Sequence, residues 1–225
     1  RKAIDLVVVG DAELNPDAVK QVVAGCDVVA SMLTPPPTAP DFIQRHVAAS
    51  TAIISAARAE QASRGVSPRR GERSKDGNSP RKVRLVVVGG AGVMSRSWPL
   101  RWDGAARPAM VTETFPGSFV KTLLPIYGDF FRAHELNLDL LQSSNAVPWT
   151  MICPGFLREG GPSRVSGHVR LWFDVNDERL GGLSATYGDV AALLVQEVLH
   201  GESRGESRGA EGRGVGRRVG IESGG

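Results

Sequence analysis

Tyr127 and His134 are the two residues whose types and spacing suit acid–base chemistry. Seven positions separate them, which corresponds to two helical turns and places both on one face of a helix. A phenol and an imidazole that point into a crevice can donate or relay a proton to a substrate during reduction. Because an imidazole titrates near neutral pH, His134→Ala is expected to lower turnover more than Tyr127→Phe. The simpler interpretation, which the pattern alone favours, is a helix face with two hydrogen-bonded polar tips.

A glycine-rich turn is the second feature with chemical meaning. The stretch RLVVVGGAGVM at 84–94 has no polar alternation, which predicts a strand covered on both faces, as in the centre of a parallel sheet. In such sheets ligands bind beyond the carboxyl ends of the strands, where glycine lets the backbone approach a bound molecule. Gly89, Gly90 and Ala91 are therefore candidate cofactor-binding residues. The alternative is an ordinary glycine-rich strand exit.

The elements that would position these residues alternate along the chain. The sequence predicts helices at 15–23, 41–62, 125–144 and 186–199, and strands at 4–9, 27–30, 85–88, 149–153, 168–173 and 217–222. This alternation predicts an α/β fold with a doubly wound, mainly parallel sheet. Residues 1–200 form the predicted domain, and residues 201–225 form a low-complexity tail with a last edge strand at 217–222. The aromatic and proline-rich stretch 95–118 is expected to be a lid or substrate wall.

The basic charge of the chain is concentrated in one segment. The formal net charge is +3, and residues 63–84 contain eight Lys and Arg against two acidic residues. Residues 63–82 are rich in Arg, Ser, Gly and Pro and have almost nothing to bury, so we expect a disordered, dispensable insertion. An RNA-binding role for this insertion is the less favoured alternative, because the segment has no aromatic residue for base stacking.

The remaining reactive side chains have structural interpretations. Cys26 and Cys153 each stand beside a strand-like run, which favours reduced thiols over a disulfide or a metal site, and no structural metal is expected. Asp189 follows Thr186 at capping-box spacing, so it is expected to cap a helix. His46, together with His168 and His200, has no partner at metal-ligand or triad spacing and is assigned a surface or capping role.

Several motifs, taken together in order, resemble a known family. They are VVVGDAELNPDAV, AGCDVVAS, HVAASTAIISAA, LVVVGGAG, GDFFRAHELNLDLLQSS, VPWTMICPGFL, YGDVAALLVQEV and GRRVGIE. In this order they resemble the atypical short-chain dehydrogenases, in the NADH-flavin-reductase-like branch related to the NmrA-like group. The resemblance implies a Rossmann-type fold that binds NADH or NADPH, with a flavin, a quinone or a similar small aromatic molecule as substrate.

The resemblance also implies which residues contact the dinucleotide. Asp11 would lie at the adenine, although a turn aspartate explains it equally well. The other implied contacts follow strands at the carboxyl edge of the sheet, facing the ribose or the nicotinamide, and are Ser31, Met32, Leu33, Pro154, Gly155 and Phe156.

Two departures from the family pattern bear on function. The opening strand–GxxGxxG–helix unit is absent, because the sequence starts where the family's third strand would stand. In the family strand order 3-2-1-4-5-6 this leaves an open sheet edge, so NADPH is expected to bind weakly or not at all. In addition, Phe131 stands four residues after Tyr127, so the YxxxK catalytic pair does not exist.

These observations predict an NAD(P)H-binding, oxidoreductase-like protein in which the cofactor supplies the hydride. A non-catalytic NAD(P)-sensing regulator or scaffold of the NmrA-like kind is the first alternative. No apolar run approaches the roughly 20 residues that span a bilayer, so the protein is expected to be soluble, in the cytoplasm or, if a transit peptide precedes Arg1, in an organelle stroma or matrix. The choice between NADH and NADPH, the substrate and the oligomeric state stay open.

Overall fold

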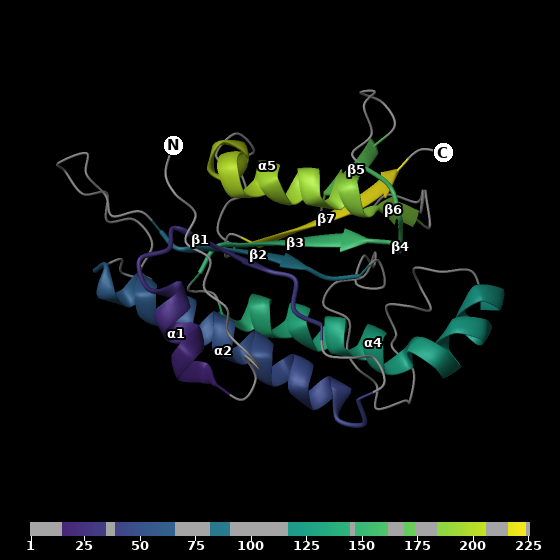
Figure 1. The fold of residues 1–225 in the computed structure, drawn as a ribbon, viewed down its shortest axis with the longest axis horizontal. Coiled ribbons are helices and arrows are strands. Elements are labelled where there is room, and N and C mark those ends of the chain that lie inside the picture. Colours follow the sequence, from purple (N-terminus) through teal and green to yellow (C-terminus); the bar gives the residue numbers. More distant parts are fainter. Residues whose placement is uncertain are drawn as a thin grey trace.

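The computed structural model describes residues 15–34, 39–65, 82–90, 117–144, 147–161, 169–173, 184–205 and 216–223. These residues form three layers, with a mixed sheet between two layers of helices (Figure 1). The helices are α1 (Pro16–Val23), α2 (Phe42–Ser63), α4 (Gly117–Ser144) and α5 (Tyr187–Gly205). Helices α1, α2 and α4 cover one face of the sheet, and α5 covers the other.

The main sheet has five strands in the order β1-β2-β3-β7-β5. Their bounds are β1 (Val28–Ser31), β2 (Arg84–Val88), β3 (Trp149–Pro154), β7 (Gly216–Ser223) and β5 (Val169–Phe173). The first four are parallel, and β5 pairs antiparallel with β7. The predicted α/β fold with parallel strands is confirmed, but β7 lies inside the sheet and β5 at its edge. The expectation of an edge strand at 217–222 was therefore wrong.

Alternating side chains of the central strands feed two separate cores. Leu85 and Val87 point toward α1, α2 and α4. Val86, between them, joins the smaller core under α5 together with Ile152 and Val219. Both faces of β2 are thus buried, which explains why its sequence is a continuous apolar run.

Helix α1 begins and ends as its sequence predicts. Asn15 Oδ1 accepts a hydrogen bond from the backbone N–H of Ala18 at 3.0 Å, and Pro16 occupies the first helical turn. Gly25 then takes the left-handed conformation, with φ of 77°, that commonly terminates a helix. At the start of α2, in contrast, the side chain of Asp41 makes no capping hydrogen bond.

Two helices are longer than predicted. Helix α4 begins at Gly117 and continues through Pro125, although Pro125 was expected to be its first residue. Helix α5 extends six residues beyond Leu199, to Gly205, and so includes the start of the predicted low-complexity tail. At its other end, Thr186 Oγ1 accepts from the N–H of Asp189 at 3.0 Å and bonds its carboxylate at 2.8 Å. Asp189 thus has the expected structural role at the start of α5, where Thr186 supplies the cap and the Asp189 carboxylate accepts from its hydroxyl.

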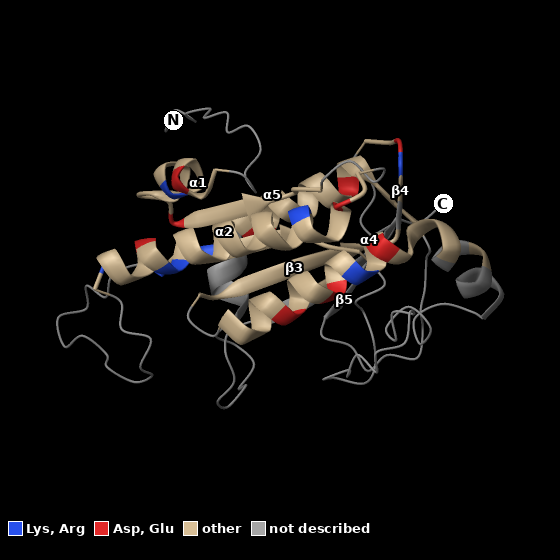
Figure 2. Cartoon of the chain, turned by 90° about the horizontal axis from the view of Figure 1, so that it is seen from below, with Lys and Arg blue, Asp and Glu red and all other residues tan. Residues whose placement is uncertain are grey.

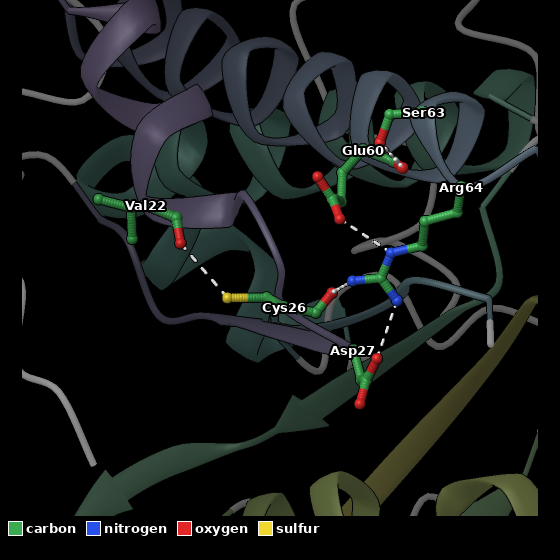
Figure 3. A network of polar contacts seen from close by, with 6 residues as sticks. All are labelled: Val22, Cys26, Asp27, Glu60, Ser63 and Arg64. Carbon is green, nitrogen blue, oxygen red and sulfur yellow. Dashed lines mark hydrogen bonds and ion pairs between the residues drawn. The ribbon is translucent and has the colours of Figure 1, made fainter. Parts of the chain in front are cut away.

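Arg64 joins the end of α2 to the turn before β1 (Figure 3). Its guanidinium donates to Glu60 Oε1 and to Asp27 Oδ1, both at 2.8 Å, and to the carbonyl of Cys26 at 2.9 Å. The hydrogen bond from Arg64 holds the pKa of the Glu60 carboxyl below its usual range. Arg64 was assigned to the disordered basic insertion, as part of 63–82, and this assignment was wrong. Residues 66–81 of the insertion lie outside the described part.

Both kinds of charged residue occur along α4, whereas α2 has few charged residues, namely Arg45, Arg58 and Glu60 (Figure 2). Neither of the two cysteines in the described ranges forms a disulfide, and Cys153 is buried whereas Cys26 is partly buried. None of the helices in the described ranges is both long and apolar enough to cross a bilayer.

Candidate functional site

The carboxyl ends of β1, β2 and β3 meet at one edge of the sheet. Ser31 pairs with Val87, and Val88 pairs with Ile152, so the segments that leave these strands start side by side. This is the edge at which ligands bind in doubly wound sheets. The arrangement brings together most of the predicted cofactor-binding residues, namely Ser31, Met32, Leu33, Gly89, Gly90, Pro154 and Gly155.

The predicted contacts differ in their exposure. Met32 is 65% exposed and Leu33 43% exposed, so two apolar side chains are available to solvent just after β1. Pro154 is buried at the end of β3 and Gly155 is half-buried. After Gly155 the chain enters a second, two-stranded sheet, in which β4 (Phe156–Arg158) pairs with β6 (Ser184–Thr186). Phe156 therefore begins a new strand close to the edge.

Several predictions fall outside the described residues. Asp11 and the strand expected at 4–9 precede residue 15, and Ala91 follows Gly90, where the description stops. Most of the expected lid at 95–118, and His168, are also outside it. Their roles stay predictions.

Glycine at positions 89 and 90 leaves space for protein side chains that lie close to the backbone there. A Cβ atom at Gly89 would lie 2.6 Å from Met151 Cε, and one at Gly90 would lie 3.3 Å from His134 Cδ2. The N–H of Gly89 also donates to the carbonyl of Ile152 at 2.7 Å, continuing the β2–β3 pairing. The glycine turn therefore brings β2 close to β3 and α4, in addition to any approach to a ligand.

His134 lies in a buried group of rings at the β2 exit, which we call the histidine cluster: Phe42 and His46 of α2, and Phe130 and His134 of α4. The ring centroids of His134 and Phe130 are 4.4 Å apart, and those of His134 and His46 are 5.2 Å apart, both edge to face. His46 and His134 are each only 2% exposed. The surface or capping role assigned to His46 was therefore wrong.

Three buried ring nitrogens of this cluster have no hydrogen-bond partner among the described residues. They are Nε2 of His46 and both nitrogens of His134. Burial, followed by the proximity of His46, lowers the pKa of His134 to about 3. Burial also lowers the pKa of His46. Both rings are consequently neutral at pH 7, because the low-polarity surroundings disfavour the imidazolium. The expectation that His134 titrates near working pH was wrong.

Tyr127 does not share the surroundings of His134. Its side chain is 41% exposed, and the neighbouring Ile126 is 68% exposed. The reason is distance along the axis, since seven residues correspond to roughly 10 Å of helix. The amino-terminal part of α4 extends past the edge of the sheet (Figure 1), which leaves Tyr127 beyond the packed region. Equal angular position on a helix therefore did not place the two side chains in one site.

One residue of the cluster, His46, was missed at the sequence level although a signal existed. Phe42, His46, Ala49 and Ile53 recur at helical spacing, and all four are buried. A histidine within such an apolar stripe is expected to be buried with it against the adjacent helix or sheet. The missing information was which α4 residue would face it.

Comparison with known proteins identifies the fold. No protein-family model matches the sequence, and no curated protein matches it either. Solved structures do. A candidate NADH-flavin reductase from Streptococcus pneumoniae is 19% identical with a TM-score of 0.53, over 91% of this chain and 75% of that one. An oxidoreductase from Lactococcus lactis is 16% identical with a TM-score of 0.56, over 96% and 71%.

A third structure agrees with these two. The anaerobilin reductase ChuY from Escherichia coli O157:H7 is 15% identical with a TM-score of 0.51, over 95% of this chain and 73% of that one. At these identities the likeness concerns the fold. Together with the parallel order of β1, β2, β3 and β7, it shows that the chain shares the Rossmann-type α/β fold of these reductases.

Proposed function

We propose that this protein binds NADH or NADPH at the carboxyl edge of β1, β2 and β3 and uses it to reduce a flat acceptor such as a flavin or a quinone. The observation that carries the proposal is the parallel register of these strands, which delivers Met32, Gly89 and Gly155 to one edge. In folds of this class a dinucleotide lies across that edge. Solved reductases that share the fold support a reductase activity.

The residues at this edge suit binding better than proton transfer. The exposed side chains of Met32 and Leu33 offer apolar surface to the flat and ribose parts of a dinucleotide. When bound, the nicotinamide supplies the hydride, and the protein orients the two rings and limits water. A flavin or a quinone takes up hydride without a strong protein acid, which agrees with the neutral state of His134 and the exposed position of Tyr127.

Titration of the protein with NADPH and with NADH, followed by nicotinamide fluorescence, tests binding. Oxidation assays over a panel of quinones and flavins then test catalysis. We expect saturable, weak binding of at least one dinucleotide. Leu33→Asp should weaken it about tenfold, because a carboxylate would replace the apolar side chain that contacts the dinucleotide. Leu199→Asp is the matched control, because Leu199 is an exposed leucine on α5. Absence of saturable binding to either dinucleotide would reject the proposal.

A second function has a specific observation in its favour. The imidazole nearest the glycine turn is buried and neutral, which is the expected state of a residue that takes no part in proton transfer. This state is also what a non-catalytic NAD(P)-sensing protein would have, which makes such a protein the alternative. Saturable dinucleotide binding with no oxidation across the whole acceptor panel would support the alternative over the reductase.

A further inference from the structure

The histidine cluster contains an unusual number of unsatisfied polar atoms. Buried side-chain nitrogens and oxygens are normally hydrogen-bonded, because leaving them without partners costs free energy of folding. His46 Nε2, His134 Nδ1 and His134 Nε2 all lack a partner, although both rings are 2% exposed. Leucine or phenylalanine at these positions would fill the same space without that cost. The two imidazoles therefore call for an explanation other than packing.

The place of the cluster in the fold supplies one. His134 borders the position beside Gly90 that a Cβ atom would occupy, with Cδ2 at 3.3 Å and Nε2 at 3.8 Å from it. Phe130 Cε1 is 3.6 Å from the same point. Gly90 directly follows β2 at the edge where the dinucleotide and the acceptor are proposed to meet. The two rings already fill the space beside the Gly90 backbone, so a ligand group at this edge reaches the unpartnered nitrogens of His134 only if a ring moves.

The chemistry of the cluster restricts which ligand group fits. Its four members are two phenylalanines and two neutral histidines, so the cluster itself has no cation to pair with a carboxylate or a phosphate. A neutral imidazole offers one N–H donor and one bare nitrogen acceptor. Between them the two rings therefore present both donors and acceptors. The uncharged complement is an amide or imide edge, where an N–H stands beside a C=O.

We propose that His46 and His134 form a buried hydrogen-bonding site for an uncharged amide or imide edge of the ligand that binds at the β2 exit. This edge is found in the carboxamide of nicotinamide and in the pyrimidine ring of a flavin, so the dinucleotide and the acceptor are the two sources. Access requires the ring of Phe130, which is half-buried, to turn aside. The choice of a dinucleotide and a flavin as the ligands rests on the proposed function. The observation that the ring nitrogens lack partners is independent of it.

Nitrogen-15 NMR of the imidazole side chains tests the contact directly in the full chain. NADPH and riboflavin are titrated separately, with nicotinate as a matched anionic ring. We expect the ring nitrogens of His134 and His46 to shift with the probe that supplies the amide or imide, and to stay unchanged with nicotinate. Ring nitrogens that remain unchanged at saturating NADPH and riboflavin would overturn the inference. Equal shifts with nicotinate would overturn the preference for an uncharged group.

Substitutions of His134 test the same contact through ligand affinity, which a purely packing role of the ring would not change. His134→Leu should weaken binding of the effective probe about tenfold, as expected for one lost hydrogen bond, while raising the melting temperature of the free protein. His134→Gln, which keeps a donor and an acceptor, should restore most of the affinity. Gln61→Leu is the control, since Gln61 is a buried polar residue far along α2. A His134→Leu variant that binds as well as wild type would overturn the inference.

The outcomes separate this inference from the proposed function. NADPH binding and turnover without any histidine shift would reject the inference alone. Histidine shifts with riboflavin in a protein that binds no dinucleotide would reject the proposed function alone. If neither probe binds, both are rejected.

Discussion

Two buried polar clusters lie on opposite faces of the sheet and differ in how their polar atoms are paired. At the amino ends of β2 and β3, under α5, Arg84 donates to the carbonyls of Glu197 and Val198, and Thr150 donates to the Glu197 carboxylate at 3.4 Å. We call Arg84, Thr150 and Glu197 the arginine cluster. At the carboxyl end of β2, under α2 and α4, the histidine cluster leaves three ring nitrogens without partners.

Burial is almost the same in the two clusters, since every arginine-cluster and histidine-cluster side chain except Phe130 is buried. Each side chain of the arginine cluster makes at least one hydrogen bond within the protein and helps to hold α5 to the sheet, although Nε and Nη1 of Arg84 make none within the described ranges. Neither ring nitrogen of His134 makes a hydrogen bond to the described residues. Buried atoms without partners beside a ligand-binding edge indicate groups that are kept for something other than stability. The two clusters therefore differ in whether the central side chain is anchored by any hydrogen bond, and not in burial.

The largest expected effect comes from breaking the arginine cluster. Arg84→Met should lower the free energy of unfolding by about 3 kcal/mol, because buried carbonyls of α5 lose a charged donor. Urea denaturation measures the change. Arg58→Met, an exposed position on α2, should change the free energy of unfolding by less than about 0.5 kcal/mol. Similar effects of the two substitutions would mean that Arg84 does not anchor α5.

The second prediction concerns pH and sharpens the contrast, because burial lowers the pKa of His134 far below its ordinary value. The imidazole of His134 has an ordinary pKa of 6.5 and a folded-state pKa of about 3. The unfolded chain thus binds the proton first, so the stability from neutral His134 is complete above pH 6.5 and is lost as the pH falls toward 3. At about pH 4.5 the loss should be about 2–3 kcal/mol.

Urea denaturation of wild type and His134→Leu at neutral pH and at about pH 4.5 provides the check. His134→Leu is expected to be the more stable protein at neutral pH, and its advantage over wild type should widen at about pH 4.5, because only wild type loses the contribution of neutral His134. Arg84→Met keeps His134 and should keep this acid loss. An unchanged pH dependence in His134→Leu would show that His134 is already charged or exposed in the folded protein.

A smaller effect is expected from the glycines beside the histidine cluster. Gly89→Ala places a Cβ atom 2.6 Å from Met151 Cε and should cost about 1–2 kcal/mol of stability through overpacking. In Gly90→Ala the new Cβ atom would lie 3.3 Å from Cδ2 of His134, so the loss of stability should be smaller. The same methyl group would occupy the space beside Nε2 of His134 and should weaken probe binding. Thermal unfolding and probe titration separate the two effects. A larger stability loss for Gly90→Ala would place the tight contact at His134.

The smallest expected effect belongs to the partly exposed Arg64 contacts. Arg64→Ala removes the bonds to Glu60 and Asp27, whose side chains are partly solvent-accessible, so the melting temperature should fall by only about 2 °C. Lys20→Ala is the matched control, because its ion pair with Asp17 is more exposed and its loss should have no measurable effect. If Arg64→Ala lowered stability as much as Arg84→Met does, solvent access would not weaken the Arg64 contacts.

The parts of the fold that were predictable depend on local signals. Asn15 and Pro16 start α1, Gly25 ends it, and Thr186 with Asp189 starts α5, because capping needs only residues a few positions apart. The apolar run of β2 likewise predicted a strand buried on both faces. These features gave the order of the elements and the edge at which the strand ends meet.

The parts that were not predictable depend on contacts between distant segments. The depressed pKa of His134 arises from the buried surroundings that include His46 of α2, and no spacing within either helix reveals that neighbour. The central position of β7 depends on pairing with both β3 and β5. The continuation of α4 through Pro125 shows a helix tolerating a residue that usually starts one.

The position of β7 has a consequence for synthesis of the chain. Strands β1, β2 and β3 can pair as they emerge from the ribosome, whereas β5 is made before β7, which is its partner in the sheet. Until residues 216–223 are translated, β3 has an open hydrogen-bonding edge and the core under α5 lacks Val219. Such an edge on a nascent chain can pair with other chains. The risk of aggregation during translation is therefore highest between completion of β3 and arrival of β7.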